Sequence, residues 1–340
     1  MATPRSGGSG NRELPEPGRT NCLPPPADCT TIQKMTSSHP RLARIRRWAR
    51  VSLICVACLF ALYLVLVLAG GGWSPRFDDT FAGQGDSALL IAHRGVALSV
   101  PENSEASLVE AQRLGFRAVE IDVRKTKSGE LVLFHDKSAR RRLGLDVEFR
   151  ELTWDRVKDS KLLFEGKATT NSVPTLREVF QKFGKTLRFY LDMKNKGFKD
   201  ADQLVALIDE FGLYDRTILA SVDPLFITYV EHKYPKVNTA LERFDFFQVW
   251  LYRSIPKRWK PDFLSGLARK VTPGHVEWLR KEQLLSKRIV YEVDATNYDR
   301  MLNFGITKAI VDYDPSVHSR TLSHPVTVNT PAVSNARPLE

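Results

Sequence analysis

Cysteine is scarce in this sequence, and its absence from most of the chain excludes several kinds of site. The 340-residue chain has four cysteines, all near its N-terminal end: Cys22, Cys29, Cys55 and Cys58. The chain after residue 58 therefore cannot form a disulfide, a cysteine-based zinc site or a thiol nucleophile. We expect a hydrophobic core alone to hold that part together, and a hydrophobic content of 43% is sufficient for one.

A strong charge of one sign is also lacking over most of the chain. The formal net charge is +11, but residues 1–50 alone hold nine Lys/Arg against three Asp/Glu. Less than half of the surplus is thus spread over the remaining residues. A surplus spread so thinly is typical of a solvated surface, so we expect no nucleic-acid partner.

One long segment has no charged residue at all. Val51–Gly70 reads VSLICVACLFALYLVLVLAG, and a helix of that length spans about 30 Å, the thickness of a bilayer core. Five arginines precede it in RLARIRRWAR, whereas GGWSPRFDD after it has one arginine and two aspartates. We therefore predict a single-pass membrane protein with a cytoplasmic N-terminus and an extracytoplasmic C-terminal domain.

A cleavable signal peptide is the alternative for this segment, because VLAGGG offers small residues to a peptidase. The apolar run is longer than the roughly 7–15 residues typical of signal peptides, so we favour an uncleaved anchor. Met35 is an alternative translation start. We predict five segments: a disordered basic cytoplasmic tail (1–50), a transmembrane helix (51–70), a linker (71–87), a folded barrel domain (88–318) and a disordered tail (319–340).

Strand-like and helix-like patterns alternate from residue 88 onward. Runs such as ALLIAHRG, AVEIDVRKT, ELVLFHD, TLRFYLDMK and TKAIVDYD have the composition of β-strands, and SEASLVEAQRLG and ADQLVALIDEFG have helical periodicity. This alternation predicts an α/β fold, a TIM (β/α)8 barrel, and fits an open doubly wound sheet less well.

Charged side chains gather near the ends of four of these β-type runs, and in a barrel such ends meet at one rim. The four sets are His93 and Arg94, Glu120 and Asp122, His135 and Asp136, and Asp192 and Lys194. A single histidine at a strand end is more often a structural residue, and an isolated E-x-D pair is often a solvated face. Four such sets on one rim favour a functional site.

Glu120 and Asp122 alternate with apolar residues along one strand. Residues two apart on a strand point to the same side, so both acids point into the barrel if their apolar neighbours pack against helices. Two buried carboxylates on one face repel each other unless a cation neutralises them. The sequence therefore predicts a metal ion or another cation beside these two acids.

The motifs resemble those of the glycerophosphodiester phosphodiesterase family, whose members are TIM barrels that hydrolyse phosphodiesters with a divalent metal. The run H-R-G is followed by P-E-N-S, E-x-D-V and T-x-x-G-E-L-V-x-x-H-D. The similarity continues through LTWDRVKD, VPTLREVF, FYLDMK, ILASVD and YEVDATNYDRMLNFGITKAIVDYDP, and so covers residues 89–315.

The resemblance also implies a role for each residue of the rim. Glu120, Asp122 and Asp192 correspond to the metal ligands of the family. His93 and His135 correspond to the general acid and base, and Arg94 and Lys194 to the phosphate contacts. A hydroxyl of the glycerol unit is implied to attack first, giving a cyclic phosphate that water then opens. Which histidine is the acid and which is the base stays open.

Three departures from the family pattern stand out. Asp192 occupies a position where glutamate is common, and its shorter side chain changes the reach toward a metal. Tyr291 stands where tryptophan is common, which puts the leaving-group pocket in question. Ser128 replaces an acidic residue, and we expect that change to be neutral.

The chemistry of a phosphodiester matches these residue types. An anionic diester requires positive charge near its non-bridging oxygens, a proton acceptor for the nucleophile and a proton donor for the leaving alkoxide. Histidine suits both proton-transfer roles because its pKa lies near working pH. We expect one divalent cation, and because the implied ligands are all oxygen atoms, Mg²⁺ or Ca²⁺.

The segment Phe244–Phe263, FDFFQVWLYRSIPKRWKPDF, departs from the alternating pattern. It mixes aromatic and basic residues, as membrane-interface segments do. An ordinary barrel loop with buried aromatics is the alternative. A membrane interface would favour lysophospholipid-like substrates over small soluble diesters.

The sequence thus predicts a membrane-anchored, metal-dependent enzyme that hydrolyses glycerophosphodiesters, or lysophospholipid-like diesters, to an alcohol and glycerol phosphate. One alternative keeps catalysis and changes the substrate to a phosphoinositide or another lipid diester. A second alternative is a catalytically inactive module that binds phospholipid head groups. The intact histidines and acids favour the enzyme.

Overall fold

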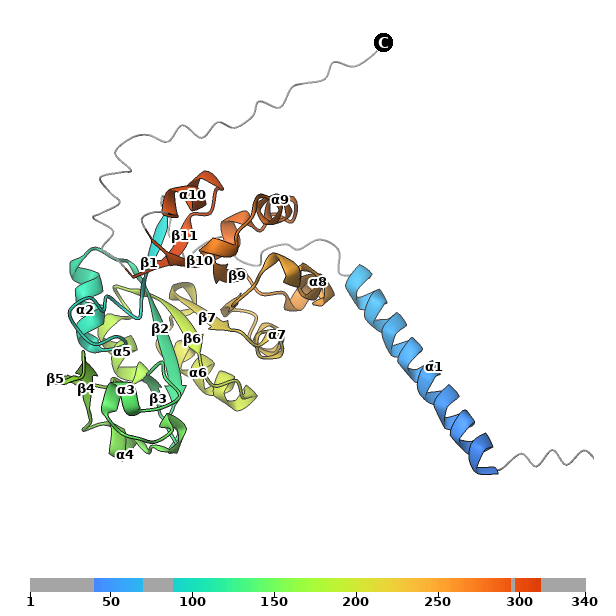
Figure 1. The fold of residues 1–340 in the computed structure, drawn as a ribbon, viewed down its shortest axis with the longest axis horizontal. Helices are drawn as coiled ribbons and strands as arrows, with labels where there is room; N and C mark the ends of the chain where they lie inside the picture. Colours follow the sequence, from blue (N-terminus) through green and yellow to red (C-terminus); the bar gives the residue numbers. More distant parts are fainter. Residues whose placement is uncertain (1–39, 70–87, 295–296, 313–340) are drawn as a thin grey trace, which may run out of the picture. The chain divides into compact units, whose positions relative to one another are not determined.

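The structure is a computed structural model, and it describes residues 40–69, 88–294 and 297–312. The expected tail up to residue 39, the linker at 71–87 and the C-terminal tail at 319–340 lie outside the described residues. The N-terminal helix α1 and the barrel are described separately (Figure 1).

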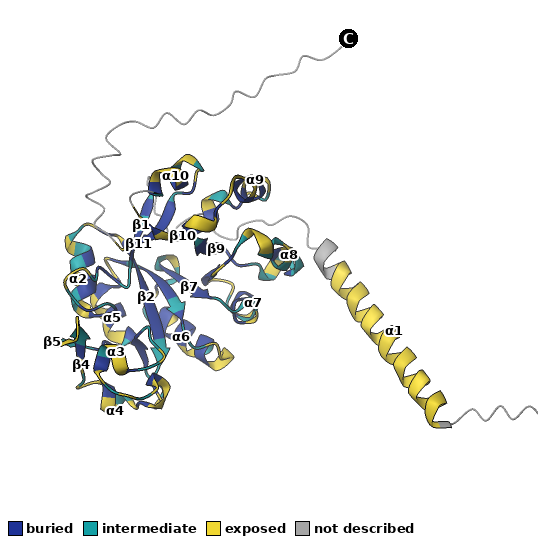
Figure 2. Ribbon diagram, viewed as in Figure 1, coloured by how far each residue is buried: buried dark blue, intermediate teal, exposed yellow. Residues whose placement is uncertain are grey.

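The helix α1 comprises Pro40–Ala69, and its side chains from residue 41 to residue 65 are exposed (Figure 2). Its segment Arg41–Val65 is long and apolar enough to cross a membrane, and an 18-residue stretch of it has a mean hydropathy of 2.1. A signal sequence near the N-terminus can pass the same test of length and composition. The helix begins ahead of the predicted start at residue 51, so residues 40–50 are helical and not part of a disordered tail. Arginine and alanine are good helix formers, which explains this correction.

Eight parallel strands close the barrel, and this confirms the predicted TIM fold. Their order around the ring is β1-β11-β10-β9-β8-β7-β6-β2, and β1 pairs with β2 to complete it. The strands are β1 (Leu89–His93), β2 (Ala118–Lys125), β6 (Arg188–Met193), β7 (Thr217–Ser221), β8 (Asn238–Leu241), β9 (Phe263–Leu267), β10 (Arg288–Val293) and β11 (Lys308–Val311).

Helices surround this ring in Figure 1. They are α2 (Glu105–Arg113), α5 (Leu176–Phe183), α6 (Phe198–Glu210), α7 (Pro224–Lys233), α8 (Val249–Ser254), α9 (Pro273–Lys281) and α10 (Tyr298–Asn303). Short 3-10 turns lie between them: η2 (Tyr214–Arg216), η3 (Phe246–Gln248), η4 (Lys257–Trp259), η5 (Ala268–Lys270) and η6 (Leu285–Lys287). Ser104 of the PENS motif starts α2 by accepting a hydrogen bond from the Ser107 amide, and so satisfies a donor that the first turn leaves free.

An insertion separates β2 from α5. It contains β3 (Leu131–Leu133), α3 (Arg140–Leu143), η1 (Phe149–Glu151), α4 (Trp154–Val157), and the antiparallel strands β4 (Lys161–Phe164) and β5 (Lys167–Ser172). Its own apolar cluster includes Phe134 and Phe149, whose rings stack with centroids 4.1 Å apart. The insertion therefore forms a small subdomain with a hydrophobic core of its own.

The barrel has two apolar layers. The outer layer lies between strands and helices and includes Val119, Ile121 and Val123 of β2. The inner cluster takes residues from all eight barrel strands, and from β2 it takes Ala118. Side chains alternate along a strand, so Glu120 and Asp122 share the inner face with Ala118. The predicted inward direction of the two acids is confirmed.

Candidate active site

A pocket of about 260 Å³ opens at the C-terminal end of the barrel strands. All seven site residues predicted from the sequence line it: His93, Arg94, Glu120, Asp122, His135, Asp192 and Lys194. Residues that we did not predict also line it, namely Glu242, Arg243, Glu292 and Asp312. A larger depression of about 710 Å³ lies elsewhere, along α5 and β5, and contains no histidine. The smaller pocket is therefore the candidate active site.

Strand register brings the acids together. In the β1–β2 pair His93 lies opposite Glu120, and in the β2–β6 pair Asp122 lies opposite Asp192. Neighbours in register on a sheet point to the same side, so all four side chains point into the barrel. Oxygen atoms of Glu120, Asp122 and Asp192 lie within 4.8 Å of one another.

His135 reaches the pocket by a route that the sequence pattern did not reveal. We expected its strand to be part of the barrel, but β3 runs antiparallel to β2, with Leu133 opposite Val123. The chain turns back after β2 and descends along it, and the Phe134 amide donates a 2.9 Å hydrogen bond to the Asp122 carbonyl. The hairpin thus returns Phe134 to the level of Asp122, and His135 follows directly.

The three acids are buried unequally and neutralised unequally. Glu120 is 4% exposed and Asp122 is 1% exposed. Burial alone would raise the pKa of Asp122, but the charges of Lys194 and Arg94 hold it below its usual value. The Lys194 ammonium lies 2.7 Å from Asp122 and also contacts Asp192, and Arg94 Nε lies 3.3 Å from Asp122. Burial and the charge of Asp122 raise the pKa of Glu120 to about 8.

These contacts test whether a divalent cation matches the site. Among the described residues, the only ionisable group that ion-pairs with Glu120 is His93, with Nε2 3.9 Å from the carboxylate. Burial is the main cause of the raised pKa of Glu120, and the charges of His93 and Lys194 offset it only in part. Buried carboxylate oxygens in a close group suit a hard cation. Glu120, Asp122 and Asp192 could hold such an ion.

Each histidine of the pocket is hydrogen-bonded to an aspartate through Nδ1. His93 Nδ1 lies 2.5 Å from Asp312, and His135 Nδ1 lies 2.8 Å from Asp136. Burial works against the charged form of His93, but the bond to Asp312 and the charge of Glu120 raise its pKa above the usual value. A carboxylate on Nδ1 fixes the proton there and leaves Nε2 free to exchange a proton.

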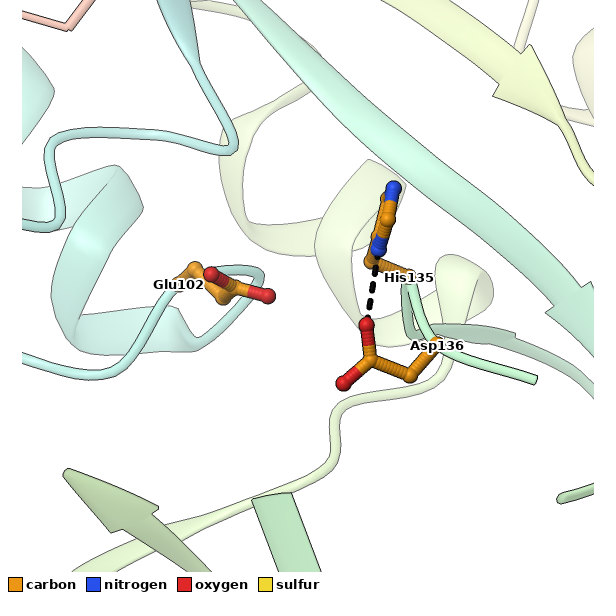
Figure 3. A group of neighbouring side chains, drawn as sticks. All are labelled: Glu102, His135 and Asp136. Atoms are coloured by element: carbon orange, nitrogen blue, oxygen red, sulfur yellow. Dashed lines mark hydrogen bonds and ion pairs between the residues drawn. The ribbon is translucent and has the colours of Figure 1, made fainter. Parts of the chain in front are cut away.

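Glu102 lies beside the pair of His135 and Asp136, and Figure 3 shows the three side chains. Two hydrogen bonds from Arg141 and one from Arg142 occupy the Glu102 carboxylate. Burial opposes ionisation, but these arginines lower the pKa of Glu102 to about 2. Arg141 also donates to both oxygens of Asp136. Arginines thus already neutralise this group, and it orients His135 without needing a metal.

Three further polar residues support the site. The Asn103 side chain donates to Asp122 at 2.7 Å and accepts from its amide at 3.0 Å. Tyr190 donates to Glu242 at 3.1 Å, and burial together with the charge of Asp192 raises the pKa of Glu242 well above its usual value. Asn103 lies in the PENS motif, whereas no sequence motif marked Glu242.

The departures from the family pattern can now be placed. Asp192 still lies within the three-acid group despite its shorter side chain. Tyr291 packs against the inner apolar cluster and borders the pocket. Ser128 lies away from the pocket, where its hydroxyl donates to Glu130 and accepts from the Trp154 amide.

Comparison with known proteins points to one family. Residues 93–327 match the model of the glycerophosphoryl diester phosphodiesterase family. A glycerophosphodiester phosphodiesterase of Caldanaerobacter subterraneus is 28% identical over 238 residues, which cover 67% of this chain and 94% of that protein. Bovine glycerophosphodiester phosphodiesterase 1 is 29% identical over 194 residues, which cover 54% of this chain and 59% of that protein.

Solved structures show the same fold. A phosphodiesterase of Oleispira antarctica, solved with the product sn-glycerol-3-phosphate, superimposes with a TM-score of 0.62 at 20% identity over 68% of this chain and 96% of that one. A phosphodiesterase of Galdieria sulphuraria gives a TM-score of 0.58 at 18% identity over 70% of this chain and 98% of that one. The match to the family model covers most of this chain. The protein therefore belongs to the glycerophosphoryl diester phosphodiesterase family and is a phosphoric diester hydrolase.

Proposed function

We propose that the protein hydrolyses glycerophosphodiesters to an alcohol and glycerol phosphate, with one divalent cation and two histidines. The observation that carries the proposal is the convergence, in one pocket, of three close carboxylates, two of them buried, with two histidines that are each held by an aspartate. Family membership supports the substrate class, and the geometry supports the assignment of residues.

The cation would be held by Glu120, Asp122 and Asp192, and the oxygen ligands favour Mg²⁺ or Ca²⁺. When bound, it would supply positive charge beside the non-bridging oxygens of the phosphate. Among the described residues, few candidates compete for this role, because Glu102 and Asp136 are already paired with arginines.

Arg94 and Lys194 would bind the phosphate. Both line the pocket, and both are fixed by acids on one side, Arg94 by Glu102 and Asp122, Lys194 by Asp122. An arginine has five N–H donors and a lysine three, so each keeps donors for an anion. The acids thus orient these cations without exhausting them.

His93 and His135 would move the protons. Because Nδ1 of each ring faces an aspartate, Nε2 is the atom left to face the substrate. One ring would take the proton of the attacking hydroxyl, from glycerol or from water, and the other would protonate the leaving alkoxide. If the glycerol hydroxyl attacks first, a cyclic phosphate forms, and the same two rings serve its opening by water in reversed roles.

The membrane topology is also part of the proposal. The length and composition of α1 support a single-pass anchor, and the arginines at its start support a cytoplasmic N-terminus and an extracytoplasmic barrel. Protease added outside intact cells should digest the barrel and spare a tag at residue 1. Release of a barrel of native size without protease would instead show that α1 is a cleaved signal.

Turnover by the full-length protein tests the proposed reaction. The protein should hydrolyse glycerophosphodiesters with Mg²⁺ or Ca²⁺ and lose activity on chelation. His93→Ala and His135→Ala should each lower kcat by about 10² to 10⁴. The double variant should lose far less than the product of both effects, because the two groups act in one step. His232→Ala, an exposed histidine on α7, is the matched control and should behave as the wild type.

The choice of substrate separates the alternatives. A nitrophenyl ester needs little protonation of its leaving group, so it should rescue the variant that lacks the acid and not the one that lacks the base. Cleavage of phosphoinositides or other lipid diesters, with no turnover of glycerophosphodiesters, would refute the substrate class. Binding without turnover of any diester would refute catalysis and favour the head-group-binding alternative.

A further inference from the structure

Exposed apolar side chains of the barrel gather on its C-terminal face. In the part of the barrel that the structure describes, the exposed large apolar residues are Leu98, Val109, Phe198, Leu225, Phe246, Phe247 and Trp250. All but Val109 follow the C-terminal end of a barrel strand, in a loop or in the first helical turns after it. Phe247 is 88% exposed and Trp250 is 67% exposed. Large aromatic groups so open to water usually mark a contact surface.

Five of these side chains follow three neighbouring strands of the ring. Phe198 begins α6 after β6, Leu225 lies in the first turn of α7 after β7, and Phe246, Phe247 and Trp250 lie in η3 and α8 after β8. Strands β6, β7 and β8 are neighbours in the ring. We call these five residues the apolar arc.

Basic side chains accompany the apolar arc. Lys196 and Lys199 lie on either side of Phe198, and Lys257 and Arg258 follow α8. Within the described residues, no ion pair engages any of these four. The acids of the same loops are occupied: Asp223 caps α7, and Asp245 pairs with Lys270 at 2.5 Å.

We propose that the apolar arc is the surface by which the barrel docks on an anionic phospholipid bilayer. Aromatic and leucine side chains flanked by lysine and arginine match the two layers of such a surface, the acyl boundary and the charged head groups. The chain offers a second reason, because residues 70–88 connect the barrel to the apolar helix α1. A bilayer that holds α1 would therefore be present at high effective concentration.

The apolar arc and the active-site pocket share one end of the barrel. Glu242 and Arg243, which line the pocket, are the residues that follow β8, and Phe246 comes three positions after Arg243. Docking by the arc would bring the mouth of the pocket to the lipid surface. The inference concerns the surface and not the reaction, so its test needs no turnover.

Fluorescence quenching in the full-length protein tests the inference. The four native cysteines are replaced by serine or alanine, and one cysteine is introduced at a time by Phe247→Cys, Val109→Cys or Phe60→Cys and labelled with a nitrobenzoxadiazole dye. The protein is reconstituted into phosphatidylcholine vesicles with or without roughly 30 mol% phosphatidylglycerol. Lipids that carry a nitroxide on the acyl chain quench dyes that enter the bilayer.

We expect the label at 247 to be quenched at least several-fold more than the label at 109 in anionic vesicles, and less in neutral ones. Val109 is the matched control, since it is 47% exposed but lies on the outer wall in α2. The label at 60 reports the α1 anchor separately. Quenching at 60 with none at 247 would overturn the inference and leave the anchor standing, whereas quenching at neither position would overturn both.

Two further results would also contradict the inference. Shielding of the label at 247 from iodide in detergent, before lipid is present, would show that a second copy or another protein covers the arc. Equal quenching in neutral and anionic vesicles would refute the role of the basic residues.

A turnover assay provides a second test. The double variant Phe247→Ser, Trp250→Ser should lower turnover of a bilayer-embedded lysophospholipid several-fold and leave turnover of a soluble diester unchanged. Loss on both substrates would refute a role confined to docking.

Discussion

Replacing Asp312 with asparagine preserves the shape of the side chain and removes its charge. In the wild type the Asp312 carboxylate accepts a hydrogen bond from His93 Nδ1 at 2.5 Å, so the proton of the neutral ring stays on Nδ1. An asparagine can accept through its oxygen or donate through its nitrogen. When it donates, the proton of His93 moves to Nε2, and the ring loses the lone pair that would take a proton from the nucleophile.

Exposure decides how large the effect should be. The Asp312 side chain is 72% exposed and that of His93 is 33% exposed, so water screens their charges. An exposed pair contributes about 1 kcal/mol or less, whereas breaking a buried pair costs about 3–5 kcal/mol. Because water screens the pair, the loss of charge alone should lower the pKa of His93 only slightly. The lost charge and the wrong tautomer together should lower kcat about 10- to 100-fold with little change in KM. This loss is smaller than the ~10⁴-fold loss known for a buried triad aspartate.

The pH profile of kcat/KM shows in which direction the pKa of His93 moves. Burial opposes the charged form of His93, but the bond to Asp312 raises its pKa, so Asp312→Asn should move the limb that His93 controls toward lower pH. A shift of the acidic limb would make His93 the base, and a shift of the alkaline limb would make it the acid. Asp312→Glu should restore part of the rate, and Asp155→Asn, an exposed aspartate of α4, should change nothing. Wild-type kcat and an unshifted profile in Asp312→Asn would refute the positioning role.

Three more predictions concern the metal and the stability of the fold. Asp192→Ala should weaken divalent-metal binding at least tenfold by calorimetry without lowering Tm, whereas Asp192→Glu should keep activity. Glu102→Gln should lower the free energy of unfolding, measured by urea titration, by up to about 3 kcal/mol at pH 7. Because the pKa of Glu102 is about 2, the difference between the two proteins should vanish as the pH falls from about 4.5 toward 2. Burial lowers the pKa of His275 to about 3. The folded protein therefore loses stability as the pH falls below about 6.5, because the unfolded chain takes up a proton at His275 that the folded protein does not. His275→Leu should be the more stable protein by about 2 kcal/mol at pH 5. Equal acid unfolding of both proteins would contradict this last expectation.

The direction of the acids was predictable because it is a local property. Alternation of Glu120 and Asp122 with apolar residues assigns opposite faces of β2, and the two apolar layers of the barrel confirm that assignment. The same reasoning could not find the partner of β3. A short apolar run has one pattern whether its neighbour is parallel or antiparallel, so only the folded chain shows that His135 arrives by a hairpin.

Partners distant in sequence were out of reach for a different reason. Asp312 is 219 positions from His93, and their contact exists because the first and last strands of the barrel are adjacent. Glu242 likewise meets Tyr190 across 52 positions. A sequence read alone places such residues at strand ends, but it does not tell which ends face one another. The start of α1 was missed because hydropathy marks the apolar segment and not the helix that continues through the arginines.

Backbone strain is concentrated at the same pocket. Four non-glycine residues there adopt positive φ angles: Arg94 at 54°, Asn103 at 53°, Arg243 at 54° and Glu292 at 53°. Each such conformation costs about 1–2 kcal/mol and persists only where other contacts hold it. The Arg94 amide donates to Glu120 at 2.9 Å, and the Asn103 amide donates to the Arg94 carbonyl at 3.0 Å. The acids assigned to the metal therefore also hold the turn that carries Arg94.

Gly95 makes this coupling testable. Its φ is +75°, and a Cβ there would lie 2.5 Å from Ser107 Oγ and 2.7 Å from the Ser107 carbonyl, so Gly95→Ala must displace the turn. Gly115→Ala is a matched control, because Gly115 has a φ of +83° with nothing within 4 Å of an added Cβ. Both variants should lose about 1 kcal/mol of stability, because an alanine in the left-handed region is strained. Only Gly95→Ala should also weaken metal binding and lower kcat, since its displaced turn pulls on the Glu120 carboxylate through the Arg94 amide. Equal metal affinity in the two variants would show that the turn and the acids are independent.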